Sequence, residues 1–289
     1  MPPTCRFLGS EDVKPSGTHP VAAGGFADIW EAIYDGRKVA LKSYRCYMRF
    51  NVAQAVERFC TEVRVCGLLH STEVNAIPLV GFYSTEAHPF ALVYEYMDGL
   101  DLKQYLSNEP GARKLKLLTN IAQSLSGMVN LGIIHRDLRA ANILVDKDGT
   151  PRIAGLGNVR IPSHSTARAA ESEIGIDRLG RSRVEPPLAL SPNVTGPTQP
   201  TEASEMYYAF GVMAFEILTG HPPFFELPGI AARNAMMTGR RPPRPNRPEV
   251  SDRLWAMVER CLHVVPSQRM SFREAVHLLE TELRNGSSS

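Results

Sequence analysis

Long apolar runs are missing from this sequence of 289 residues, and none approaches the roughly 18 residues that a membrane-spanning helix needs. Charge of one sign is scarce as well, because 32 Lys and Arg against 30 Asp and Glu leave a net charge of +2. The five cysteines show no metal-ligand or redox spacing. We therefore expect reduced thiols, a cytoplasmic location, and neither nucleic acid nor a membrane among the partners.

A chain of 289 residues, of which 43% are hydrophobic and 21% charged, is long and apolar enough to form one large domain or two lobes with a shared core. The first 20 residues include Pro2, Pro3, Pro15, Gly17 and Pro20, and they contain no signal-peptide core. We expect residues 1–20 to form a flexible leader and residues 285–289 a frayed tail.

Two kinds of periodicity divide the chain. Short β-rich runs are expected at 21–30, 38–44, 77–83 and 89–96, with an amphipathic helix at 52–69 between them. Helices are expected in the second part, at 115–129, 203–219, 229–238, 252–263 and 271–284. A hairpin is expected at 143–154, and a long surface loop at 158–200.

The strongest motif is His135-Arg136-Asp137-Leu138-Arg139-Ala140-Ala141-Asn142. It reads His-Arg-Asp-Leu-x-x-x-Asn and resembles the catalytic loop of protein kinases. The resemblance implies that Asp137 accepts or orients the proton of an attacking hydroxyl and that Asn142 holds a metal on the nucleotide phosphates. Arg139 stands where serine/threonine kinases more often have a lysine that touches the γ-phosphate, and its guanidinium is expected to do similar work with different geometry. The alternative, a core histidine followed by an aspartate that caps a turn, explains single residues but not the whole pattern.

Val39-Ala40-Leu41-Lys42 resembles the kinase strand whose lysine contacts the α- and β-phosphates. The same resemblance pairs Lys42 with Glu62 on the helix that follows. Each residue alone reads equally well as a surface charge, so the motif order carries the prediction.

Gly24-Gly25-Phe26-Ala27 resembles the kinase glycine-rich loop only in part. Ala22 and Ala27 stand where the first and third glycines belong, and Gly24 is retained. A simple Gly-Gly hairpin explains the segment equally well.

Leu92-Val93-Tyr94-Glu95-Tyr96-Met97 resembles the hinge between kinase lobes. The resemblance implies that Glu95 and Met97 offer backbone groups to adenine and that Tyr94 narrows the pocket behind it. Further residues implied to line the nucleotide pocket are Ala22, Ile29, Ala40 and Leu144.

Gly155-Leu156-Gly157 stands where protein kinases have Asp-Phe-Gly, so the carboxylate expected to bind the main magnesium ion is missing. Leu156 can serve as an apolar plug beside Cys66, Leu79 and His135. Asn142 alone is a poor ligand, because magnesium favours anionic oxygens.

Two more departures concern the segment before the large helix at 203–219. The kinase Ala-Pro-Glu element is represented by Glu185-Pro186-Pro187, so its pairing with Arg269 depends on Glu185 from a shifted position. Glu205 replaces the aspartate that begins the large helix, and its longer side chain is expected to weaken bonds to the catalytic loop.

The motifs occur in protein-kinase order over nearly the whole chain. The sequences of residues 204–220 and 253–279 most resemble those of tyrosine kinases and tyrosine-kinase-like serine/threonine kinases. The resemblance implies an α+β, two-lobed fold. A small lobe at 21–97 would hold a five-stranded antiparallel sheet and one helix, and a larger helical lobe would occupy 98–284.

Two functions remain open at this stage. One is a pseudokinase that binds ATP with weak or no need for magnesium and acts through unidentified protein partners. The other is a divergent active kinase that transfers the ATP γ-phosphate to Ser, Thr or Tyr hydroxyls. The lost carboxylate favours the first, since phosphoryl transfer depends on electrostatic stabilisation.

Overall fold

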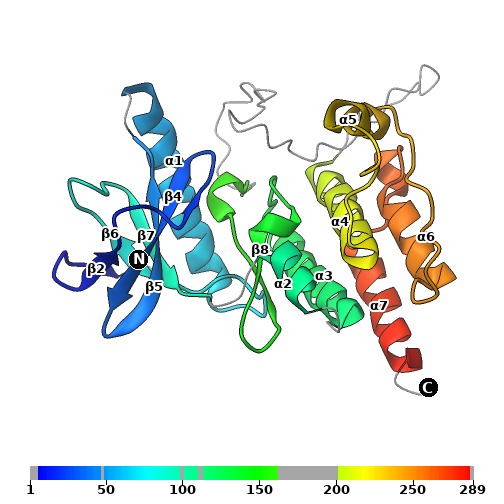
Figure 1. Cartoon of the computed structure of the whole chain (residues 1–289), viewed down its shortest axis with the longest axis horizontal. Coiled ribbons are helices and arrows are strands. Elements are labelled where there is room, and N and C mark those ends of the chain that lie inside the picture. The colour runs from blue at the N-terminus through cyan, green and yellow to red at the C-terminus, as the bar shows by residue number, and fades with distance from the viewer. Residues whose placement is uncertain (1–5, 47–48, 98–100, 110–112, 162–200, 287–289) are drawn as a thin grey trace.

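The structure, a computed structural model, describes residues 6–46, 49–97, 101–109, 113–161 and 201–286. A β-sheet with one helix lies at one end of the molecule, and a group of helices lies at the other (Figure 1). The predicted α+β, two-lobed architecture is confirmed.

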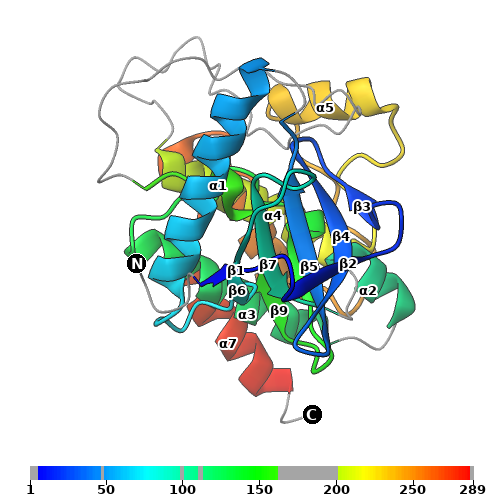
Figure 2. The ribbon, with the colours of Figure 1, turned by 90° about the vertical axis from the view of Figure 1, so that its left-hand side faces the viewer.

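The small lobe is built on one sheet with strand order β1-β6-β7-β5-β4-β2, and β3 pairs with β4. Its strands are β1 (Phe7–Leu8), β2 (Val13–Ser16), β3 (Ala22–Ala23), β4 (Ala27–Tyr34), β5 (Arg37–Tyr44), β6 (Leu79–Tyr83) and β7 (Ala91–Glu95). Helix α1 (Arg49–Leu69) runs along the side of this sheet (Figure 2).

Strand β5 shows how side-chain alternation prepares the site. Val39 and Leu41 point to one face and are buried in a small-lobe core. Ala40, Lys42 and Tyr44 share the opposite face, and Tyr44 belongs to the main core cluster. Period-2 alternation thus places Lys42 and Tyr44 together.

Two predictions about this lobe need correction. Residues 7–16 of the expected leader contribute β1 and β2, and Leu8 and Val13 are fully buried. The expected five-stranded antiparallel sheet has seven strands, and β1 pairs with β6 in parallel. Both errors arise because the prolines and glycines of this region hide two short runs that become ordered only by pairing with β6 and β4.

The large lobe contains most of the helices. They are α2 (Leu102–Asn108), α3 (Lys114–Asn130), α4 (Glu202–Thr219), α5 (Gly229–Met237), α6 (Asp252–Cys261) and α7 (Phe272–Gly286). The hairpin of β8 (Ile143–Val145) and β9 (Pro151–Ile153) lies between the sheet and these helices (Figure 1). The 3-10 turns are η1 (Ala140–Asn142), η2 (Leu156–Asn158) and η4 (Pro266–Gln268).

Helix ends follow local chemistry. Thr201 caps α4 by accepting from the backbone of Ser204 at 3.2 Å, and Gly220 ends it with a φ of 80°. In the first turn of α7, Glu274 accepts a hydrogen bond from the backbone N–H of Ser271 at 2.9 Å, as a capping box requires. The Arg260 hydrogen bond and the Ser271 backbone bond lower the pKa of Glu274 to about 2.

Among the described residues, the helices are all too short or too polar to cross a membrane. The core of the large lobe centres on α4, whose Phe210 and Met213 are almost completely buried. Leu156 and Ile153 belong to the same cluster as these residues, so the predicted site sits directly on the main core.

The burial of β1 leads to a stability prediction. Leu8→Ala should lower the free energy of unfolding by about 2–4 kcal/mol, because it leaves a cavity in a fully buried position. The control Lys14→Ala, at an exposed position in β2, should change it by less than about 0.5 kcal/mol. Urea denaturation of both variants checks this, and equal midpoints would show that the first strand does not contribute to the core.

Candidate functional site

Lys42 and Glu62 meet between the sheet and α1. The Lys42 Nζ atom lies 2.8 Å from Oε1 and 2.7 Å from Oε2 of Glu62. The Glu62 side chain is 1% exposed and that of Lys42 is 17% exposed. The structure therefore brings together the two charges that the sequence pairs, and it leaves only the lysine accessible.

Two tyrosines complete the surroundings of Glu62. Tyr94 donates its hydroxyl to Oε1 at 2.6 Å, and Tyr44 donates to Oε2. The Tyr94 hydroxyl also lies 3.8 Å from the sulfur of Cys66. Burial, with the neighbouring acidic groups, raises the pKa of both phenols well above its usual range, so both are neutral donors at physiological pH.

The partial glycine-rich loop is the hairpin between β3 and β4. Its Gly24 carbonyl accepts from the side chain of Arg45. Phe26, at the tip, is covered by the guanidinium of Arg58 at 3.5 Å from the ring centroid, and Arg58 also donates to Asn158. Arg58 thus connects the hairpin to the residue that follows Gly-Leu-Gly.

The strand register places the other expected pocket residues near Lys42. Ile29 lies opposite Lys42 on β4, and Ala22 lies opposite Ile29 on β3. Ala40 lies opposite Tyr94 on β7. Leu144, on β8, is partly buried against the main core. Their roles toward a nucleotide stay predictions.

The expected hinge begins where β7 ends. Glu95 is the last residue of β7, and its backbone N–H donates to the carbonyl of Pro78 at 3.1 Å. Met97 is partly buried against the main core. Residues 98–100 lie outside the described residues.

His135 organises the catalytic-loop motif from the inside. It is fully buried, and its Nε2 lies 2.8 Å from the carbonyl of Ala154. Its Nδ1 accepts from the backbone N–H of Asp137 at 3.3 Å, so Nε2 carries the proton. Burial lowers the pKa of His135, which keeps the imidazole neutral in this role.

Asp137 and Asn142 are joined directly. The Asn142 Nδ2 donates to the backbone oxygen of Asp137 at 2.7 Å and to its Oδ2 at 3.1 Å. Arg139 Nε lies 3.9 Å from the other carboxylate oxygen. This arrangement fixes the orientation of a partly exposed carboxylate, and the motif residues named by the sequence lie together. The role of Asp137 as a proton acceptor stays a prediction.

Gly155 has a left-handed backbone with a φ of 75°. A Cβ atom built on it would lie 2.7 Å from Cγ of Asn142. Gly155 therefore packs closely against the Asn142 amide, and any larger residue at this position would meet that amide.

A tightly bound magnesium ion would need anionic oxygens close to Asn142. Within the described residues, no group of three or more His, Cys, Asp or Glu side chains is placed to hold a metal. Asp146 is engaged in its own hairpin, where it accepts from Thr150 at 2.9 Å and pairs with Arg152 at 3.0 Å. Among the described residues, the carboxylate that bonds the Asn142 amide is that of Asp137.

Arg269 is buried inside the large lobe, where its exposed fraction is 5%. It donates to the carbonyls of His263 at 2.9 Å and Ser204 at 3.0 Å, and its Nη2 makes no hydrogen bond to a described residue. Glu185 and Pro187 lie outside the described residues, so their expected relation to Arg269 stays a prediction.

The first turns of α4 contact the catalytic-loop motif through the sulfur atom of Met206. The backbone N–H of His135 points to the Met206 sulfur at 3.3 Å. Glu205, the preceding residue, lies in the first turn of α4. The expected weakening of its own bonds stays a prediction.

Three contributors were missed from sequence: Tyr44, Arg58 and Asn158. Tyr44 is two residues after Lys42 on a strand, so the alternation of side chains could have revealed it. Arg58 is four residues before Glu62 on a helix, which places both on one face. Asn158 could not be found this way, because its contact spans 100 positions of sequence.

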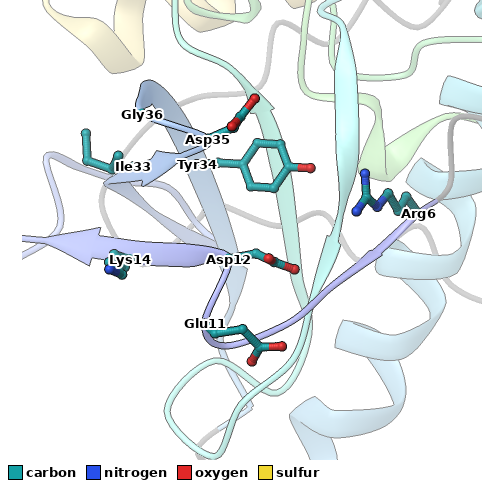
Figure 3. Close-up of a pocket in the computed structure, with 8 residues that line it drawn as sticks. All are labelled: Arg6, Glu11, Asp12, Lys14, Ile33, Tyr34, Asp35 and Gly36. Atoms are coloured by element: carbon teal, nitrogen blue, oxygen red, sulfur yellow. The ribbon is translucent and has the colours of Figure 1, made fainter.

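A separate hollow of about 490 Å³ lies on the small lobe (Figure 3). It is lined by side chains of both signs from the residue before β1, the turn before β2, β2 itself and the β4–β5 turn, among them Arg6, Glu11, Asp12, Lys14 and Asp35. None of the predicted site residues lines it. The hollow is therefore distinct from the site around Glu62.

Comparison with known proteins agrees with this geometry. A family model described as protein tyrosine and serine/threonine kinase matches residues 17–279. Serine/threonine-protein kinase PkaA of Streptomyces coelicolor is 32% identical over 241 residues, which are 82% of this chain and 41% of that protein.

Two plant proteins extend the comparison. The leucine-rich repeat receptor protein kinase MSP1 of Oryza sativa is 31% identical over 220 residues, 72% of this chain and 16% of its own length. Serine/threonine-protein kinase STY46 of Arabidopsis thaliana is 25% identical over 269 residues, 91% of this chain and 43% of its own. The chain spans less than half of each relative. Since the family model matches most of its residues, the chain belongs to the protein tyrosine and serine/threonine kinase family.

Proposed function

We propose that this chain is a pseudokinase domain that binds ATP with little help from magnesium and acts mainly through protein partners in the cytoplasm. Phosphate transfer is slow or absent. The observation that carries the proposal is Gly155, which stands against the Asn142 amide where the metal carboxylate is expected. Loss of one electrostatic contact of this kind costs on the order of 3 kcal/mol in the transition state, more than a hundredfold in rate.

Nucleotide binding is supported by the cationic side of the site. Lys42 is paired with Glu62 and is still partly accessible. The β3–β4 hairpin stands opposite it in the strand register. These groups can hold phosphates by charge and hydrogen bonds without a metal.

An active divergent kinase is the second candidate, and one observation favours it. Asp137 is oriented by Asn142 and lies within 3.9 Å of Arg139. A proton acceptor and a cation are therefore present for a hydroxyl substrate. What this candidate lacks is the charge that offsets the phosphates during transfer.

Metal-independent binding is directly testable. ATP should raise the melting temperature of the protein by nearly the same amount in EDTA and in magnesium. Lys42→Met should abolish the shift, because it removes the accessible cation of the site. The control Lys147→Met changes an exposed lysine at the β8–β9 turn and should keep the shift. A shift that requires magnesium would contradict the proposal.

The role of position 155 can be isolated with two variants. Asn and Asp both tolerate a positive φ better than other residues, so Gly155→Asn and Gly155→Asp share the strain and the contact with Asn142. The Asp variant alone adds an anionic ligand. Its magnesium-dependent phosphate transfer should exceed that of the Asn variant by at least roughly tenfold.

The readout is transfer of the ATP γ-phosphate to a general protein substrate, measured beside magnesium–ATP binding. Adding Asp137→Asn to the Asp variant should remove the gain. If both variants bind magnesium–ATP and transfer equally, the inactivity does not come from position 155. Wild-type transfer at an ordinary kinase rate would establish the active-kinase candidate instead.

A further inference from the structure

The carboxylate of Glu62 has more donors than one lysine can supply. Lys42 and Tyr44 reach it from β5, and Tyr94 reaches it from β7. All three come from the same face of the sheet, because Tyr44 follows Lys42 by two residues and Leu92, two residues before Tyr94, lies opposite Lys42. Helix α1 is therefore tied to two strands through one carboxylate.

Two phenols are enough to satisfy this carboxylate if the lysine leaves. An unpaired buried carboxylate is strongly destabilising, and hydrogen bonds to a charged acceptor are about twice as strong as neutral ones. Tyr94 bonds Oε1 and Tyr44 bonds Oε2, so each oxygen keeps one donor without Lys42.

Both rings are fixed in place by their packing. Tyr44 and Tyr94 are each 3% exposed, and the ring of Tyr44 meets Phe59 edge-on with centroids 6.4 Å apart. Gly157 leaves the space that the Tyr44 hydroxyl occupies, since a Cβ there would lie 2.7 Å from it. The hydroxyls are thus held toward Glu62 before any ligand arrives.

We propose that Tyr44 and Tyr94 are positioning residues that hold Glu62, and with it α1, against the sheet independently of Lys42. The ammonium of Lys42 is then available to bind the phosphates of a nucleoside triphosphate whose charge no tightly held metal offsets. The part that concerns phosphates rests on the proposed function. The part that concerns α1 stands without it.

Hydrogen exchange of the α1 peptides, measured without nucleotide, tests the first part. Lys42→Met should exchange within about twofold of wild type, because both carboxylate oxygens keep a donor. Tyr44→Phe with Tyr94→Phe should speed exchange at least roughly tenfold, because the carboxylate then depends on one partly exposed lysine in place of two buried hydroxyls fixed by β5 and β7. Tyr83→Phe, a buried tyrosine of the other small-lobe cluster, is the matched control and should match wild type.

Nucleotide binding tests the second part. The double Phe variant should lose affinity for ATP, because Glu62 now holds Lys42, and it should keep its affinity for adenosine, which has no phosphates. A general loss of packing would weaken both ligands alike, so the split between them distinguishes positioning from structural damage. If the double variant does not fold, each single Phe variant should show the same direction with a smaller change.

The outcomes are decisive in each direction. The proposal is overturned if Lys42→Met frees α1 as much as the two Phe changes do, or if the Phe variant matches Tyr83→Phe. Equal losses of ATP and adenosine affinity would overturn the part that concerns Lys42. If wild type binds neither ligand, the proposed function fails, while the exchange measurement still decides whether the tyrosines hold α1.

Discussion

The small lobe depends on how one buried negative charge is satisfied. Glu62 is almost completely buried between α1 and the sheet, where an unpaired carboxylate would be strongly destabilising. Its bonds reach β5 and β7, so the charge that burial makes costly also fixes the helix to the sheet. From the same helix, Arg58 reaches the β3–β4 hairpin and η2. The position of α1 therefore sets the geometry of the hairpin and of the segment that begins with Gly-Leu-Gly.

The catalytic loop is organised by a different principle, because its key polar groups are fixed by backbone contacts. His135 bonds a carbonyl with one nitrogen and an N–H with the other, and Asn142 bonds both the backbone and the carboxylate of Asp137. None of these bonds involves position 155. The framework of the catalytic-loop motif therefore forms with a glycine at position 155 and needs no side chain there.

The features that could be predicted from the sequence are those that a local pattern or the order of the motifs encodes. The long helices, the hairpin and the pairing of Lys42 with Glu62 follow from periodicity and motif order, and the structure contains them. The strands β1 and β2 were missed because they hold only two and four residues, and the burial of Leu8 and Val13 depends on pairing with β6 and β4 later in the chain. Asn158 was missed for the same reason, since contacts over long sequence separations leave no local pattern. Tyr44 was within reach of the sequence, because strand alternation alone places it beside Lys42.

The residues kept and replaced at the site bear differently on nucleotide binding and on phosphate transfer: Lys42 and Glu62 are kept, and Gly155 stands where a carboxylate is expected. Ground-state binding of a nucleotide needs cations and donors that exist before the reaction, and in the proposed function Lys42 and the hairpin backbone have this role. Transfer needs additional charge stabilisation that acts in the transition state, and a metal carboxylate contributes there. In the proposed function, the absence of that carboxylate lowers the rate more than the affinity, because Lys42 and the bonded Glu62 remain in place. On that proposal, the kinase fold of this chain binds nucleotide and protein partners after efficient transfer is lost.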